Sequence, residues 1–123
     1  MILKITGLPD YVVGFEAMGD VTKADYDNII IPAVNEVTKR TGELYYLFVI
    51  KTSLQNFSAG AWWDDLKLGL QHLTHWKKMA IVSDNKGIEK FTDLFSFVVP
   101  GEAKGFLLDE LEEAKRWVSE KIS

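Results

Sequence analysis

The sequence predicts an α/β layer fold in a single domain that spans residues 1–123, and three observations support this prediction. Segments with strand composition alternate along the chain with segments in which apolar residues recur at helical spacing. The middle strand-like segments are apolar throughout, which is typical of strands covered on both faces. The length of 123 residues suits one domain and is enough to bury a core without disulfides. We therefore expect the order β-β-α-β-α-β-α-β-α with right-handed crossovers.

The first two elements are expected to form an antiparallel hairpin. Residues 2–5 and 11–18 both have strand composition. Gly7 and Pro9 lie between them, and these residue types favour a turn.

A long helix with a kink is expected next. Thr22 followed by Asp25 resembles a capping box, and Gly42 is a residue type that ends helices. Apolar residues between these ends recur at helical spacing and give the helix a buried face. Pro32 lies inside this pattern, where its ring removes one backbone donor and clashes with the preceding turn. We therefore expect a kink near Asn28 or two abutting helical pieces.

The second half of the chain predicts three more strands and three more helices. In chain order these are an apolar strand (44–50), a helix (59–75), a short buried strand (79–82), a helix capped by residues 83–85, an edge strand (103–107) and a C-terminal helix that starts at residue 109 and has Leu111, Ala114, Val118 and Ile122 on one side.

Composition and charge argue against several classes of function. The formal net charge is −4 and no basic tract is present, which argues against binding to nucleic-acid backbones. With no cysteine, the chain offers neither a disulfide framework nor a thiolate metal cage, and we expect no cofactor. Charged runs such as Lys77–Lys78 are expected on solvated faces. No apolar run is long enough to span a membrane and the first residues lack the features of a signal peptide, so we expect a cytoplasmic domain.

Three polar loops are expected to gather at one edge of the sheet, outside the carboxyl ends of parallel strands and where successive strands lead in opposite directions. They cover residues 19–22, 51–58 and 83–87, and each leads into the N-terminus of a predicted helix. One interpretation is that their hydroxyl and amide side chains only cap helices. The other is that the free N–H groups of the helices near Ser58 and Asn85 bind an anionic group.

The candidate catalytic residues do not fit a hydrolase. Ser58 and His75 lie at opposite ends of one predicted helix, and the helical rise separates them by roughly 20 Å, far beyond hydrogen-bond reach. The sequence has no GxSxG motif. His72 and His75 could face one metal ion, but the sequence offers no nearby third ligand. We therefore expect no catalytic residues and no metal site. An enzyme is accordingly less favoured than either of the two binding functions considered below.

The aromatic residues favour a binding surface. Trp62 and Trp63 lie about 100° apart on a helix, so one two-layer core cannot easily bury both. The segment 95–99 is also more apolar than a surface connection requires. One interpretation is core packing plus a contact between subunits, and the other is an apolar pocket or surface for a ligand, a membrane or a partner. The residues concerned are Phe57, Trp62, Trp63, Phe91, Phe95 and Phe97.

Six segments of the chain, at compatible spacing, resemble a known family. They are GDVTKADY (19–26), IPAV (31–34), WKKMAIVSD (76–84), PGEAK (100–104), DE (109–110) and EAKRWV (113–118). On these segments the chain resembles the SpoIIAA-like family, a small group within the STAS fold class that is related to the CRAL-TRIO lipid-binding domain. The resemblance implies a right-handed βα superhelix with a mixed sheet of four or five strands and about four helices. It implies no established enzymatic activity.

The same resemblance concerns Ser58. In the anti-sigma-factor antagonists of this fold class, a partner kinase phosphorylates a serine in an Asp-Ser-Ser-Gly loop. Aligned on Gly60, the first serine of that motif falls on Ser58. The phosphorylated serine falls on Ala59 and the aspartate on Phe57, so the chain departs from the motif at both positions. Ser58 and Ser53 are left as candidates for phosphorylation, and a phosphate on Ser58 would be stabilised by the helix N-terminus that it caps.

These observations predict a non-enzymatic binding module for an apolar or amphipathic small molecule or for a membrane surface, and kinship with CRAL-TRIO domains also favours this function. Contacts would come from the six aromatic residues named above, and Ser58 and Asn85 would receive an anionic head group. The alternative is a protein-interaction module like the anti-sigma-factor antagonists, with a regulatory protein as partner and phosphorylation of Ser58 as the switch. A homodimer through exposed aromatic surface is a further expectation, and peripheral membrane association would accompany the first function.

Overall fold

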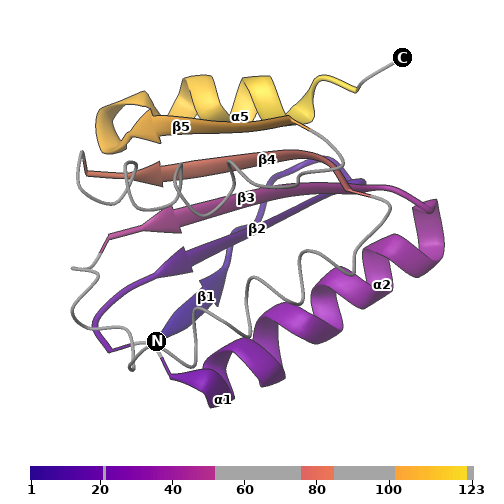
Figure 1. Cartoon of the computed structure of the whole chain (residues 1–123), viewed down its shortest axis with the longest axis horizontal. Helices are drawn as coiled ribbons and strands as arrows, with labels where there is room; N and C mark the ends of the chain where they lie inside the picture. Colours follow the sequence, from indigo (N-terminus) through magenta and orange to yellow (C-terminus); the bar gives the residue numbers. More distant parts are fainter. Residues whose placement is uncertain (21, 52–75, 85–101, 122–123) are drawn as a thin grey trace.

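The computed structural model of the chain describes residues 1–20, 22–51, 76–84 and 102–121 (Figure 1). Its elements, in chain order, are β1 (Ile2–Lys4), β2 (Val12–Ala17), α1 (Lys23–Asp25), the π-helix η1 (Tyr26–Ile30), α2 (Ile31–Thr41), β3 (Leu44–Ile50), β4 (Trp76–Ser83), β5 (Glu102–Leu107), the 3-10 helix η3 (Leu108–Glu110) and α5 (Leu111–Ser119).

The five strands form one mixed sheet in the order β1-β2-β3-β4-β5. β1 is antiparallel to β2, and β2 to β5 are parallel to one another (Figure 1). The predicted hairpin and the predicted mixed sheet of four or five strands are therefore confirmed. In the connection between β1 and β2, Gly7 has a φ of 82°, a conformation that residues with a Cβ rarely adopt.

β3 connects the two halves of the hydrophobic core. All seven of its residues are buried, as predicted for an apolar strand covered on both faces. Successive side chains of a strand point to opposite faces, so Tyr46 and Phe48 belong to one core cluster and Tyr45 and Leu47 to the other. The helices between β2 and β3 cover the first face, and α5 covers the second (Figure 1).

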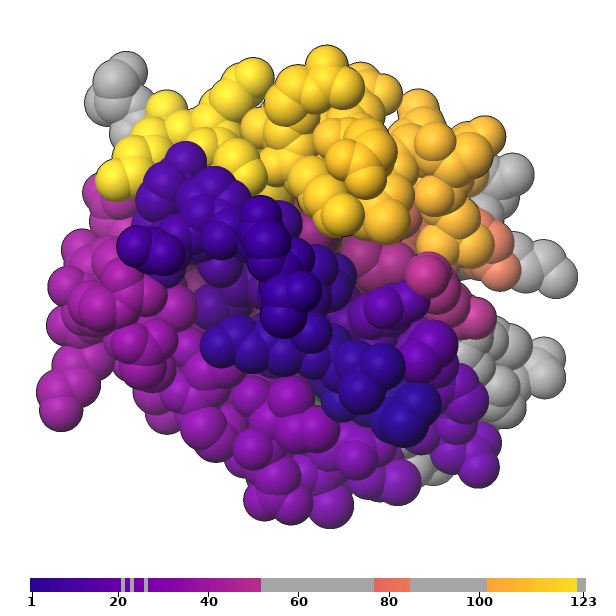
Figure 2. Space-filling model, turned by 180° about the vertical axis from the view of Figure 1, so that it is seen from behind, coloured from indigo at the N-terminus to yellow at the C-terminus, as the bar shows by residue number. Residues whose placement is uncertain are grey.

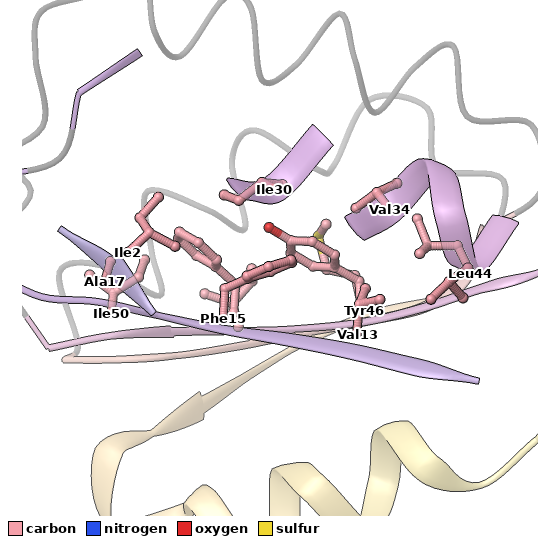
Figure 3. Close-up of a cluster of buried hydrophobic side chains, with 13 residues drawn as sticks. Ile2, Val13, Phe15, Ala17, Ile30, Val34, Leu44, Tyr46 and Ile50 are labelled. Atoms are coloured by element: carbon pink, nitrogen blue, oxygen red, sulfur yellow. The ribbon is translucent and has the colours of Figure 1, made fainter. Parts of the chain in front are cut away.

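The cluster on the α2 face shows how the helices pack on the sheet. In Figure 3, Ile30 and Val34 point from the helices toward Phe15 and Tyr46 of the sheet. The rings of Phe15 and Tyr46 lie 5.8 Å apart. Ile30 is 2% exposed and Val34 is 5% exposed, and burial of an aliphatic side chain of this size stabilises the fold by about 1.5–3 kcal/mol.

Pro32 explains the form of the helix between β2 and β3. It has no N–H to donate to the carbonyl of Asn28, and the preceding turn, Tyr26–Ile30, is a π-helix. The helix is therefore interrupted where the kink is predicted. α2 is closed by Gly42, which has a φ of 75° and donates its N–H to the carbonyl of Thr38 at 2.8 Å, as the sequence predicts.

One expectation about surface charge is wrong. The sequence predicts a solvated face at Lys77–Lys78, but Lys78 is only 6% exposed. Its ammonium donates to the carbonyl of Trp117 at 2.9 Å and lies 4.6 Å from the centre of the Trp117 ring. The reason is tertiary: the side chain of Lys78 lies on the face of β4 that α5 covers.

Part of the predicted fold lies outside the described residues. This is true of the helix over residues 59–75, of the helix capped by residues 83–85 and of Ile122. The predicted number of about four helices therefore stays a prediction. The C-terminal helix has the predicted inner side, because Ala114 and Val118 are both 0% exposed.

We expect Ala114→Leu to lower the free energy of unfolding by about 1–3 kcal/mol, because Ala114 is fully buried in the core cluster under α5 and a larger side chain overpacks it. Arg116→Leu is the matched control, since Arg116 is exposed on the same helix. The control should change the free energy of unfolding by less than about 1 kcal/mol. Urea unfolding followed by circular dichroism measures both values, and equal losses would contradict close packing at Ala114.

Candidate functional site

The last residue of β5 and the residues that follow the four parallel strands lie at one edge of the sheet, which we call the carboxyl edge. Its described residues are 18–20, 22, 51, 84 and 107–110. The strand register places Ala17 beside Ile50, Val49 beside Val82 and Ser83 beside Leu107. The predicted gathering of the three polar loops is therefore confirmed for those of their residues that are described.

The described sheet has no crevice between strands that lead in opposite directions. β3, β4 and β5 are each added on the same side of the preceding strand. A crevice of the expected kind requires the strand order to reverse, so this part of the prediction is wrong for the strands described.

The first of the predicted anion-binding loops is a helix cap. The N–H of Asp25 donates to Oγ1 of Thr22 at 3.1 Å, and the N–H of Thr22 donates to Oδ2 of Asp25 at 3.2 Å. This reciprocal pair satisfies a free N–H group at the start of α1 and places a carboxylate there. The cap uses the N–H groups that an anion would need, and the Asp25 carboxylate also lies 3.5 Å from the N-terminal ammonium, so the capping interpretation holds at Thr22.

Lys51 ties the ends of β2 and β3 together. Its N–H donates to the carbonyl of Ala17 at 2.9 Å, and its ammonium lies 2.5 Å from Oε1 of Glu16. The Lys51 side chain is 49% exposed, so we expect the ion pair to contribute at most about 1 kcal/mol. Its effect on the site is to neutralise Glu16 and to hold the backbone where the chain leaves β3.

Two leucines form an apolar corner of the carboxyl edge. Leu107, the last residue of β5, is 37% exposed, and Leu108, the first residue of η3, is 42% exposed. The N–H of Leu107 donates to Oε1 of Glu110 at 2.8 Å, and Asp109 is exposed beside them. The apolar corner therefore lies next to two carboxylates. The sequence signal that could have revealed it is the run Phe106–Leu108 at the end of the predicted strand, because Leu107 must point away from the face that buries Phe106.

The site residues predicted from the sequence all lie outside the described residues. The structure therefore neither brings them together nor separates them, and they stay predictions. They are Phe57, Ser58, Trp62, Trp63, Asn85, Phe91, Phe95 and Phe97.

A cavity of about 390 Å³ lies at the amino end of β2, away from the carboxyl edge. Its walls are the connection between β1 and β2 and the C-terminal half of α2, which lie side by side on the face shown in Figure 2. The guanidinium of Arg40 donates to Oε1 of Glu36 at 3.0 Å and to the carbonyl of Asp10 at 2.6 Å. Lys4 and Asp10 also line the cavity, so the positive and negative side chains of its walls balance and it does not favour an ionic ligand. The sequence does not predict it, because its walls come from distant segments.

Two kinds of site find no support in the described part of the chain. No group of three or more histidine or acidic side chains there could hold a metal ion. None of the helices described is both long and apolar enough to cross a membrane.

One protein family matches the chain. A family model described as SpoIIAA-like matches residues 12–119, which run from the start of β2 to the end of α5. No curated protein matches the chain, and no solved structure matches it.

We expect Thr22→Ala to lower the free energy of unfolding by about 0.5–2 kcal/mol, because it removes the cap of α1. Thr6→Ala is the control, since Thr6 is exposed in the connection between β1 and β2, and it should cost less than about 0.5 kcal/mol. Asp25→Ala combined with Thr22→Ala should cost less than the sum of the two single losses, because the two hydrogen bonds form one unit. Additive losses in urea unfolding would contradict the reciprocal cap.

Proposed function

Because the chain belongs to the SpoIIAA-like family, we propose that it is a protein-interaction module, similar to the antagonists of anti-sigma factors, that binds a regulatory protein through its carboxyl edge. The family match covers the strands β2 to β5 and α5. The observation that supports the choice of surface is the apolar corner formed by Leu107 and Leu108.

The apolar corner has the composition of a contact surface. Large apolar side chains that are exposed next to one another favour association with another protein. The carboxylates of Asp109 and Glu110 lie beside the corner, whereas Glu112 is already paired with Lys115 at 3.5 Å. Such an arrangement favours a partner surface that combines apolar and basic side chains. Of the described residues, the other exposed large apolar ones are Met1 and Leu3, near β1 on the opposite margin of the sheet.

Hydrogen bonds and an ion pair within the chain also hold the backbone of the carboxyl edge in place. The cap formed by Thr22 and Asp25 and the ties made by Lys51 hold the backbone on which recognition loops would be carried. A surface that is already ordered loses little conformational entropy on binding, which favours affinity. Loops on a rigid scaffold are the usual place for recognition residues.

Binding of an apolar or amphipathic small molecule, or of a membrane surface, is a separate prediction from the sequence. It depends on aromatic side chains outside the described residues, and no contact among the described residues supports it. It stays a prediction beside the proposed function.

We expect the double variant Leu107→Glu with Leu108→Glu to lower capture of the protein partner at least about tenfold, because it replaces the apolar corner with charge. Leu3→Glu is the matched control, since Leu3 is 43% exposed on β1, and it should leave capture unchanged. Quantitative mass spectrometry of proteins retained by the immobilised wild type and variants, from an extract of the source cells, measures the effect. A partner retained equally by all three proteins would place the interaction elsewhere.

We further propose Ser58 as the residue that switches the interaction; it comes eight residues after the end of β3. Ser58→Asp should weaken partner capture by about tenfold or more, because a fixed negative charge imitates phosphorylation. Ser58→Ala should bind like the wild type. Equal affinities for the two variants in the same capture experiment would remove the switch and leave the interaction surface itself standing.

A further inference from the structure

β5 is the outer strand of the described sheet. It pairs with β4 on one side, and no described strand lies on its other side (Figure 1). Four successive residues of this strand, Glu102–Gly105, are exposed. The outer side of such a strand can pair with a strand of another chain unless its side chains prevent it.

The side chains of β5 carry complementary charges. Glu102 and Lys104 are two residues apart and project from the same face of the strand. Neither residue forms an ion pair within the described part of the chain. The ammonium of Lys104 lies 5.1 Å from the centre of the Phe106 ring, on the face that α5 covers.

We propose that β5 pairs antiparallel with β5 of a second copy of this chain, about a two-fold axis at Ala103. In this register Ala103 lies opposite Ala103 of the partner subunit. Glu102 lies opposite the partner's Lys104, and Lys104 lies opposite the partner's Glu102. Directly opposed side chains have Cβ atoms about 4.5–5.5 Å apart, and opposite charges at that distance stabilise the pairing. The two sheets then continue into one another across the axis.

The charges of Glu102 and Lys104 favour the register centred on Ala103 over the register centred on Lys104. Moving the axis by one residue, to Lys104, keeps the faces of the two sheets matched but places Lys104 opposite Lys104 of the partner subunit. Like charges directly opposed destabilise a strand pair. A lysine on an outer strand normally prevents pairing with an unrelated strand. Here the same lysine meets a carboxylate when the incoming strand is a second copy in antiparallel orientation, which is the self-complementary arrangement that a two-fold dimer requires.

The interface is short, so we expect the dimer to dissociate on dilution. Only one strand from each copy takes part, and interfaces of small area are at the weak end of specific association.

Single cysteine variants test the register without background, because the chain has no cysteine. Ala103→Cys should give a covalent dimer on mild oxidation, since the two thiols would lie close to disulfide range across the axis. Gly105→Cys is the control, because in this register the two introduced thiols would be about 14 Å apart, and it should stay monomeric on a non-reducing gel. Cross-linking of Gly105→Cys instead, or of neither variant, would overturn the proposal.

Charge reversal tests the interaction itself. Glu102→Lys and Lys104→Glu should each weaken the dimer at least about tenfold, because both cross-strand contacts become like-charged. The double variant that exchanges the two residues should restore dimerisation to within about threefold of the wild type, since both pairs are re-formed in reverse. Sedimentation velocity over a wide concentration range measures the dimer, and circular dichroism checks that each variant is folded. A wild type that is monomeric throughout, or a dimer that both single reversals leave unchanged, would refute the pairing.

Discussion

The burial of β3 on both faces is the constraint on which the rest of the structure depends. All seven residues of this strand are buried, and a strand of this kind is stable only when both of its faces are covered. α2 and its preceding turns supply one cover, and α5 supplies the other. The need to cover both faces of β3 therefore places helices on opposite sides of the sheet. Among the described elements, this leaves the margins and ends of the sheet to contact other molecules.

The polar groups near the carboxyl edge serve the scaffold before they serve recognition. Thr22 and Asp25 cap one another across the start of α1, and Lys51 pairs with Glu16 between neighbouring strands. Because these donors and acceptors already have partners, the described part of the edge does not present an empty anion site. It exposes the apolar corner of Leu107 and Leu108 with carboxylates beside it. Such a surface suits contact with a protein better than contact with a phosphate group.

Prediction from the sequence was most accurate where structure is local. The strand over residues 44–50 and the closure of α2 at Gly42 depend on composition and backbone conformation at the positions themselves. The predicted strand 79–82 is shorter than β4, which spans Trp76–Ser83. The prediction stopped short because Lys77–Lys78 interrupts the apolar run in the sequence, although Lys78 is buried under α5. The predicted aromatic site lies outside the described residues. The apolar corner and the cavity beside Arg40 were missed, because exposure and enclosure depend on segments distant in the sequence.

The sequence by itself determined the closure of α2 at Gly42, the cap at Thr22 and the interruption before Pro32, because each follows from the hydrogen bonds that a few neighbouring residues can make. Only the tertiary structure decided that the strand order does not reverse, that the ammonium of Lys78 is held by the carbonyl of Trp117, and that β5 is left as an outer strand. These features depend on which distant segments become neighbours when both faces of β3 are covered. Local propensity carries no information about that choice, because the free energy that decides it comes from burial shared among many elements.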